Sequence, residues 1–381
     1  MESMTDVGRR IRRGMPHGLS QRALAQQVGM TPDALSRALN GQRGLSAVEV
    51  AAIASVLGVD THWLITGQAD PLKVSVAARH SWDAQRRERV NDGRTDDQAI
   101  LDQIVAVYRA AFPQGPPASS KLPASPGELR GLLGSSFVRE FADTSETRLG
   151  IDVIRIPGLK TDYSLRIGER GVVVLATQSS WFRSNWSLAH ELGHLALDHH
   201  SPRDGRQPVQ REEKEADRFA ADLLLPSAAL HRIANATDAT AVAAMIWELG
   251  VSTEAIRNQL RTAGLRPALE VGEALLLTTP RLLRDNLHAL PSGEKHDPIM
   301  EREQASSARR FPLSLLSALQ DQTERGAASP VLLAWALEVP VDDLEFPEPI
   351  DEDAAVILAR ITADRPTAAE WRSIVAGSTE R

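Results

Sequence analysis

The segment SLAHELGHLALDHH, residues 187–200, places His190 and His194 four residues apart with Glu191 directly after the first histidine. On a helix this spacing sets both imidazoles on one face, one turn apart, where they can bind one metal ion. Glu191 then lies beside the open coordination position of that ion. The helix also has an apolar face, which consists of Leu188, Leu192 and Leu195. The segment therefore predicts a partly buried helix that carries a metal site.

The composition limits which ligands such a site can use. The 381 residues include ten histidines and no cysteine. Disulfides and thiolate metal sites are excluded, so a transition-metal site must use His, Asp or Glu. A catalytic zinc ion needs a third protein ligand and keeps its fourth position for water. We therefore predict one zinc ion per chain, with a third ligand from a helix downstream. His199 and His200 are predicted to be polar residues at the helix end rather than ligands.

That downstream helix is predicted at residues 210–226, QREEKEADRFAADLLLP. Glu212 and Glu213 each fall about 50° from the centre of its apolar stripe, whereas Glu215 falls more than about 100° away and is predicted to face solvent. We select Glu213 because Asp217 follows one turn later, where its carboxylate can accept the free N–H of a ligating histidine. Glu212 is the alternative ligand. The alternative interpretation of these glutamates is the solvated edge of an amphipathic helix.

Residues 20–67 carry the start and stop signals of several helices. Ser20 can cap one helix, and Gly29 can end it in the left-handed conformation. Thr31 can cap the next helix, with Pro32 at its first position. Two more helices follow, one with Val48, Val50, Ile53, Ala54 and Leu57 at helical spacing and one around Trp63 and Leu64. With a helix over residues 5–13, the pattern predicts a five-helix domain over residues 1–70.

The charge of this N-terminal part differs from that of the whole chain. A net charge of −7 argues against a chain that binds nucleic acid along its whole length. Residues 1–44, in contrast, hold seven arginines against three acidic residues, a local excess of four positive charges. This imbalance predicts one nucleic-acid-binding face.

Two short helices across a tight turn are typical of a helix-turn-helix, whose second helix enters the major groove with its N-terminal residues at base edges. The corresponding residues here are Thr31, Pro32, Asp33, Ser36 and Arg37. A helical bundle used for protein contacts is the alternative interpretation. Ser36 and Arg37 are predicted to face solvent under both interpretations.

The rest of the chain divides into three predicted parts. Residues 71–125 contain one amphipathic helix near 102–112 and a linker rich in Pro and Ser. Residues 126–267 contain a helical stripe, then strands at 151–156, 164–167 and 172–176, and then the two motif helices. Residues 268–381 form a helical accessory region without a readable motif. The predicted fold class is therefore multidomain: an all-α five-helix domain, an α+β domain with a small sheet, and a mainly helical C-terminal region.

Two parts of the sequence resemble known families. The strings WSLAHELGHLALDH and EKEADRFAADLLLP, preceded by a strand hairpin and followed by WELGVSTEAIRNQL, resemble the ImmA/IrrE family of metallopeptidases. Residues 1–70 resemble an XRE-type helix-turn-helix. The resemblance covers these residues and about 128–265, and it implies a zincin-like fold. In the related XRE domains, the positions of Gln21, Asn40 and Arg43 would contact phosphates or bases.

Together these features predict a DNA-binding transcriptional regulator with a gluzincin-like zinc endopeptidase domain. His190, His194 and Glu213 are the expected metal ligands, and Glu191 is the expected general base and acid. The resemblance implies a repressor or other regulatory protein as the substrate. The alternative function is a transcription factor whose metallopeptidase-like domain only senses a ligand or a metal.

The sequence also bears on the cellular location of the protein, its oligomeric state and the residue that would stabilise the oxyanion. No segment approaches the roughly 18 consecutive apolar residues of a membrane span, and the N-terminus lacks the apolar core of a secretory signal, so we expect a cytoplasmic protein with no membrane partner. XRE-type domains often pair on two-fold symmetric sites, and a homodimer is expected by this analogy. Because Tyr108 and Tyr163 both lie upstream of the motif, the sequence assigns no residue that stabilises an oxyanion.

Overall fold

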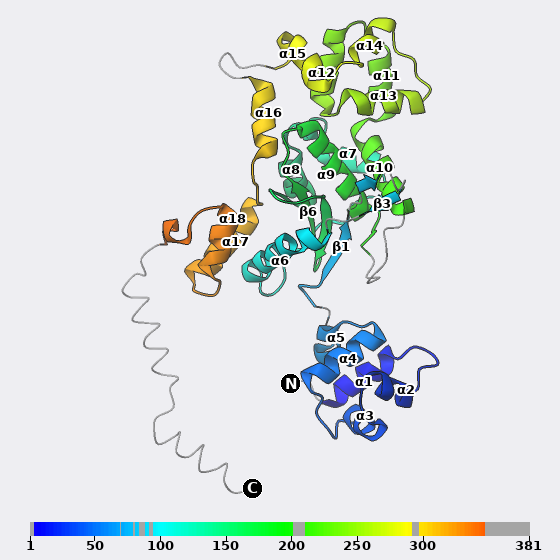
Figure 1. Ribbon diagram of the computed structural model, residues 1–381, viewed down its shortest axis with the longest axis vertical. Coiled ribbons are helices and arrows are strands. Elements are labelled where there is room, and N and C mark those ends of the chain that lie inside the picture. The colour runs from blue at the N-terminus through cyan, green and yellow to red at the C-terminus, as the bar shows by residue number, and fades with distance from the viewer. Residues whose placement is uncertain are drawn as a thin grey trace.

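The computed structural model describes residues 4–68, 70–78, 81–83, 88–90, 94–200, 210–291 and 297–346. In chain order it has an N-terminal helical part, a central four-stranded sheet covered by helices, and a helical C-terminal part (Figure 1). This order confirms the predicted fold class. Of the helices in the described ranges, none alone has the length and apolar character to cross a membrane, while the bent pair Ala239–Leu249 and Thr253–Thr262 passes by length and composition only.

The N-terminal part consists of the five predicted helices, α1 (Met4–Gly14), α2 (Gln21–Gln27), α3 (Pro32–Leu39), α4 (Ala47–Leu57) and α5 (Thr61–Thr66). Ser20 and Thr31 accept hydrogen bonds from backbone N–H groups three residues later and so cap α2 and α3, as predicted. Gly29 has a φ of 69° and follows the end of α2, which confirms its predicted role. Val48 lies in the first turn of α4, as its spacing indicated, and its side chain is 79% exposed.

The sheet has the strand order β1-β5-β6-β4, with β1 (Val74–Ala78), β4 (Asp152–Ile156), β5 (Tyr163–Ile167) and β6 (Arg170–Ala176). β5 and β6 form the predicted antiparallel hairpin, β4 pairs with β6 in parallel, and β1 pairs with β5 antiparallel. Successive side chains of a strand point to opposite faces. Val173 and Leu175 of β6 therefore enter one hydrophobic core, and Val172 and Val174 enter another.

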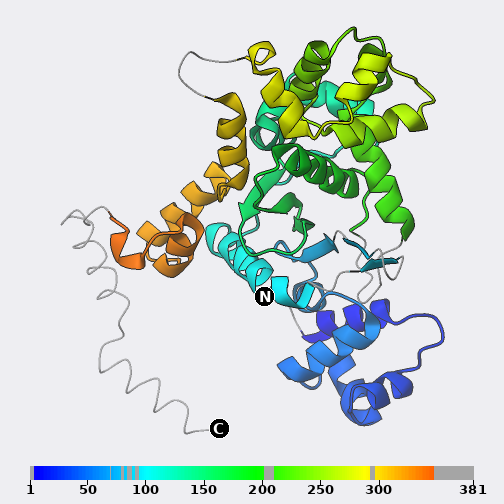
Figure 2. The ribbon, with the colours of Figure 1, turned by 45° about the horizontal axis from the view of Figure 1, so that its top comes forward.

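The first core lies between the sheet and the two motif helices, α9 (Trp181–Ala196) and α10 (Gln210–Leu224). Further elements surround these helices: α7 (Pro126–Leu133), η1 (Phe137–Glu140), α8 (Phe141–Thr144), η2 (Ser145–Leu149), α11 (Ser227–Ala234), α12 (Ala239–Leu249) and α13 (Thr253–Thr262). The second core lies on the opposite face, under α6 (Arg94–Ala111). The motif helices therefore lie on one side of the sheet and α6 on the other (Figure 2).

Residues 71–125 contribute more to the central part than the sequence predicted. The expected helix is α6, which begins earlier than predicted, at Arg94. Strand β1 was not predicted, nor was the separate two-stranded sheet of β2 (Ser81–Asp83) and β3 (Glu88–Val90). The sequence placed the start of the α+β unit at residue 126. Because β1 and α6 pack with the same sheet, we propose that this unit begins at β1.

The C-terminal part divides between the two cores. Three elements, α14 (Leu269–Ala274), α15 (Thr279–Asp285) and η3 (Leu287–Ala289), pack against α12, and α16 (Pro298–Ser307) packs against α9. The last helices, α17 (Leu313–Glu324) and α18 (Pro330–Leu337), lie beside α6 and are followed by η4 (Val341–Asp343). The predicted helical character is confirmed for the described residues of this part, 268–291 and 297–346. The prediction for residues 347–381 lies outside the described residues.

Candidate metal centre

Helices α9 and α10 approach each other closely because Gly193 has no side chain. A Cβ atom at Gly193 would lie 3.3 Å from the Cα atom of Ala216 and 3.2 Å from the Cβ atom of Phe219, both on α10. Leu192 and Phe219 are buried in the core that the two helices share. This contact places the first turn of α10, which carries Glu213, beside the middle of α9.

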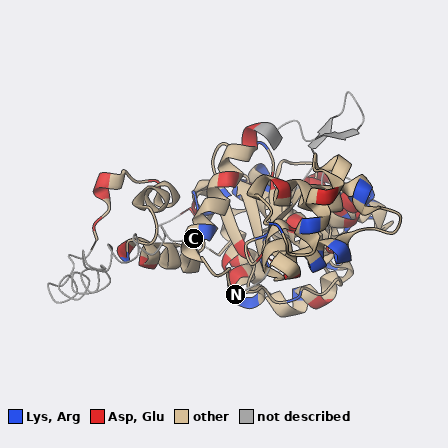
Figure 3. Cartoon of the chain, turned by 90° about the horizontal axis from the view of Figure 1, so that it is seen from below, with Lys and Arg blue, Asp and Glu red and all other residues tan. Residues whose placement is uncertain are grey.

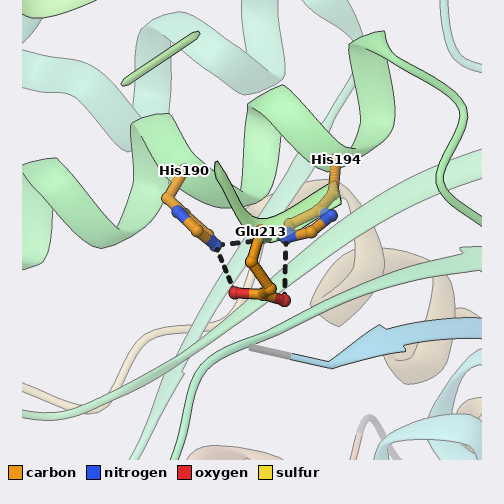
Figure 4. Close-up of side chains that lie close together, drawn as sticks. All are labelled: His190, His194 and Glu213. Carbon is orange, nitrogen blue, oxygen red and sulfur yellow. Dashed lines mark hydrogen bonds and ion pairs between the residues drawn. The ribbon is translucent and has the colours of Figure 1, made fainter. Parts of the chain in front are cut away.

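Three side chains converge at this contact (Figure 4). The Nε2 atoms of His190 and His194 are 3.1 Å apart. Glu213 places Oε2 3.5 Å from Nε2 of His190 and Oε1 3.6 Å from Nε2 of His194. All three side chains are buried. The structure thus brings together the three residues that the sequence selected, whereas the rival Glu212 is only half-buried and lies outside the cluster.

The separations of these atoms fit one tetrahedral zinc ion. Zinc–ligand distances of about 2.1 Å at tetrahedral angles put the ligand atoms about 3.4 Å apart. The three observed separations, 3.1, 3.5 and 3.6 Å, lie close to this value. Nitrogen–oxygen distances of 3.5 and 3.6 Å are also longer than good hydrogen bonds. The two histidine–carboxylate separations therefore suit a shared cation better than a direct hydrogen bond, whereas the two imidazole nitrogens are within hydrogen-bond distance of each other.

Burial keeps at least one of the two imidazoles neutral. Removal from water lowers the pKa of His194 to about 2, and the neighbouring His190 also lowers this pKa. The contact between His194 and Glu213, at 3.6 Å, is therefore not an ion pair. A neutral imidazole carries one nitrogen lone pair that can bind a metal. Two nitrogens and one carboxylate facing a common point are a donor set that suits zinc.

Each histidine has a partner for its other ring nitrogen. Nδ1 of His190 lies 2.9 Å from Oδ1 of Asp217, the pairing that the sequence predicted. Nδ1 of His194 lies 2.9 Å from Nδ1 of His199, and Nε2 of His199 lies 3.5 Å from Glu215. Such partners fix the ring orientation and the tautomer of a metal-binding histidine.

His199 and Glu215 are the residues that the sequence interpretation missed. His199 was predicted to be a polar residue at the helix end, but only 8% of its side-chain area is exposed and its ring contacts His194. Asp198 adopts a left-handed φ of 55°, which ends the helix and turns the chain back toward the site. Helical spacing does not extend beyond such a turn, so it could not place His199. Glu215, predicted to face solvent, is 40% exposed and contacts both His199 and Arg211.

Glu191 is fully buried on α9, next to His190 in the sequence. Both tyrosines, in contrast, belong to the core on the opposite face of the sheet. Tyr108 donates a hydrogen bond to Asp152, and Tyr163 donates one to Asp97. Burial raises the pKa of Tyr108 well above its usual value, and the Asp152 carboxylate raises it further. Neither tyrosine is placed to stabilise an oxyanion at the metal centre.

Most of the predicted DNA-contacting residues of the five-helix domain are exposed. The exposed positions are Gln21, Thr31, Pro32, Asp33, Arg37 and Asn40. Ser36 is half-buried, so its predicted solvent exposure is only partial. Arg43 is half-buried and donates to Glu49, a hydrogen bond of 2.8 Å. Seen from below, basic and acidic residues are interspersed over the molecule (Figure 3), so the local basic excess does not extend to the whole chain.

Comparison with known families agrees with both predicted regions. Residues 146–261 match the peptidase M78 family model, described as the IrrE N-terminal-like domain. Residues 9–64 match a family model described as helix-turn-helix. The predicted combination of an XRE-type helix-turn-helix with an ImmA/IrrE-type domain is thus confirmed. Comparisons with curated proteins and with solved structures found no match.

Proposed function

We propose that this chain is a DNA-binding transcriptional regulator whose IrrE N-terminal-like domain is a zinc-dependent endopeptidase. Its substrate is a repressor or another regulatory protein, as the family resemblance implies. The observation that carries the proposal is the cluster of His190, His194 and Glu213, which are buried and place ligand atoms within 4.8 Å of one another. Glu191 is buried on the same helix as the two histidines. A purely structural metal site would have no use for Glu191.

The proposed reaction is hydrolysis of one peptide bond. When bound, zinc would supply Lewis acidity that polarises the scissile carbonyl and lowers the pKa of water to about 7. Glu191 takes the proton of the attacking water and later donates it to the leaving amine. His190, His194 and Glu213 hold the metal, and Asp217 holds the ring of His190 in the orientation that this requires.

The N-terminal domain keeps this activity near DNA. Its family match and the exposure of Thr31, Asp33 and Arg37 support contacts of these residues with the major groove. Arg37 already lies 3.0 Å from Asp33 on the same exposed face. This ion pair is exposed and weak, so it leaves the guanidinium available to DNA.

Metal analysis and one conservative substitution test the proposal. The purified protein should contain about one zinc per chain, and His190→Ala should lose it. Glu191→Gln should retain zinc and DNA binding but should not cleave a co-encoded repressor. If Glu191→Gln cleaves the repressor and regulates its genes as well as the wild type, the endopeptidase proposal fails and the sensor function takes its place.

A further inference from the structure

A cavity of about 270 Å³ lies beside the first half of α9. It is lined by η1 and α8 on one side, by the ends of β4 and β6 on another, and by α16 of the C-terminal part. His190, His194 and Glu213 are not among its lining residues. The cavity is therefore separate from the candidate metal centre, although Ser184, Asn185 and Leu188 of α9 contribute to its wall.

Three arginines line this cavity: Arg139, Arg155 and Arg302. Two acidic residues, Glu140 and Asp143, also line it, and Asp143 already lies 2.6 Å from Arg310. Loss of water lowers the pKa of Arg302 to about 10, and the charge of Arg139 also lowers it. Burial lowers the pKa of Arg155 as well, and Arg310 lowers it further, whereas the carboxylates of Asp143 and Glu146 raise it. The cavity thus holds three arginines against two acidic residues, and the hydration of Arg155 and Arg302 is incomplete.

Arg302 is held in a fixed position. Its guanidinium carbon lies 3.6 Å from the ring centre of Trp247 and 4.8 Å from that of Trp181. Its NH1 group donates to the backbone carbonyl of Trp247 at 3.0 Å. Stacking on two rings removes most of the freedom of an arginine side chain. A planar donor fixed in this way is suited to recognise a carboxylate or a phosphate.

Two polar atoms at the cavity are buried and lack partners within the described residues. The hydroxyl of Ser306 belongs to a residue that is only 3% exposed, and it makes no hydrogen bond there. Nε of Arg155 is likewise buried without an acceptor, although its NH1 group donates to the carbonyl of Ala305. Buried donors without acceptors cost free energy and are uncommon in folded proteins. Both atoms belong to residues that line the same cavity, so a ligand with acceptor atoms bound there would lie beside them.

The remaining wall is apolar and consists of Val138, Phe141, Val153, Leu175 and Leu188. Ligand cavities commonly combine such a wall with a few fixed polar groups. The volume is slightly below the usual range for drug-sized ligands. The wall and the charges together therefore suit a small molecule with one anionic group and a compact apolar part.

We propose that this cavity binds a small organic anion, whose carboxylate or phosphate group is held by Arg155, Arg302 and Ser306. The apolar part of the ligand packs against Phe141, Leu175 and Leu188. Because α16 and α9 both line the cavity, the ligand joins the C-terminal part to the helix that carries the metal-binding histidines. This site gives residues 298–307 a function that the sequence did not indicate. It does not depend on zinc binding or on peptidase activity.

Calorimetric titration of the full-length protein tests the site, with benzoate, phenyl phosphate and inorganic phosphate as probes. We expect saturable binding of benzoate or phenyl phosphate, and the tighter of the two identifies the anionic group. Inorganic phosphate, which lacks the apolar part, should bind at least about tenfold more weakly than the better probe. Ser306→Ala and Arg155→Gln should each weaken binding by about tenfold, because each removes a hydrogen bond to a charged group.

Arg183→Gln is the matched control, since Arg183 is an exposed arginine of α9 that does not line the cavity. It should bind the probes as the wild type does. The melting temperature without ligand gives a second measurement, because Ser306→Ala removes a buried hydroxyl without a partner and should not lower stability. The proposal is overturned if no probe binds saturably at millimolar concentration. It is also overturned if Ser306→Ala and Arg155→Gln bind the probes as tightly as Arg183→Gln.

Discussion

Replacement of His199 by alanine tests the contacts behind the metal ligands. Nδ1 of His199 lies 2.9 Å from Nδ1 of His194, so the variant removes the group that keeps Nε2 of His194 turned toward the metal. Loss of such an outer partner weakens metal binding by about 10- to 100-fold, which corresponds to about 1.4–2.7 kcal/mol. Because the His199 side chain is only 8% exposed, water cannot easily replace the lost contact. We therefore expect a loss in the upper half of this range.

Glu215, which contacts His199, should contribute less to zinc affinity than His199 does. Glu215 is 40% exposed, lies 3.5 Å from Nε2 of His199 and also accepts a hydrogen bond from Arg211. Exposed ion pairs contribute about 0–1 kcal/mol, so Glu215→Gln should weaken zinc binding by less than about fivefold. The expected order of zinc affinity is therefore wild type, then Glu215→Gln, then His199→Ala.

Competition with a chromophoric zinc chelator at neutral pH measures these affinities directly. Glu212→Gln is the matched control, because Glu212 lies on the same turn of α10 but outside the cluster. A zinc affinity of His199→Ala equal to that of the control would refute the role of His199. A loss of affinity in Glu212→Gln equal to that in Glu213→Gln would instead overturn the choice of the third ligand.

Three further predictions concern other parts of the chain. In Gly8→Ala the new Cβ atom would lie 2.1 Å from the carbonyl oxygen of Leu39, so α1 and α3 must separate. We expect a destabilisation of about 1–3 kcal/mol or more and loss of DNA binding, with unchanged zinc content. Retained DNA affinity would contradict this. Arg37→Gln should weaken DNA binding and reduce its salt dependence by about one ion, whereas Arg257→Gln, outside the five-helix domain, should do neither. Burial lowers the pKa of His200 from 6.5 to about 4, so the unfolded chain takes up the proton first and stability falls as the pH drops from 6.5 toward 4. Between pH 7 and pH 5 this loss is about 2 kcal/mol, and metal-free His200→Gln should lose that much less in chemical unfolding; equal losses in the two proteins would exclude the effect.

The elements with local signals could be predicted from the sequence. Helix α3 has its cap at Thr31 and its proline at the first position, and both act as the sequence indicated. The metal cluster could be predicted because His190 and His194 share one helix face by spacing alone. The choice of Glu213 needed only the apolar stripe of α10 and the position of Asp217 one turn later. In each case the decisive contacts lie within one helix or follow from its periodicity.

The elements without local signals could not be predicted in this way. Strand β1 is specified by pairing with β5, more than eighty residues later in the chain. The packing of α17 and α18 beside α6 depends on apolar faces whose sequences do not identify the helix they pack against. His199 reaches His194 only because Asp198 adopts a left-handed conformation, which a short polar side chain tolerates but does not require. The sequence therefore predicts which segments form helices, but it does not predict which distant segments they pack against.

The position of β1 also bears on why DNA binding and proteolysis would share one chain. Helix α5 ends at Thr66 and β1 begins at Val74, so residues 67–73 connect the five-helix domain to the edge of the sheet. Seven residues span at most about 25 Å when fully extended. Under the proposed function, a peptidase tethered this closely meets a repressor on neighbouring DNA at a high effective concentration, which compensates for weak intrinsic affinity. A longer inserted linker between residues 67 and 73 should therefore slow cleavage of a DNA-bound repressor and leave cleavage of the same repressor in free solution unchanged; equal slowing of both would show that the connection supports the fold of the peptidase rather than its delivery.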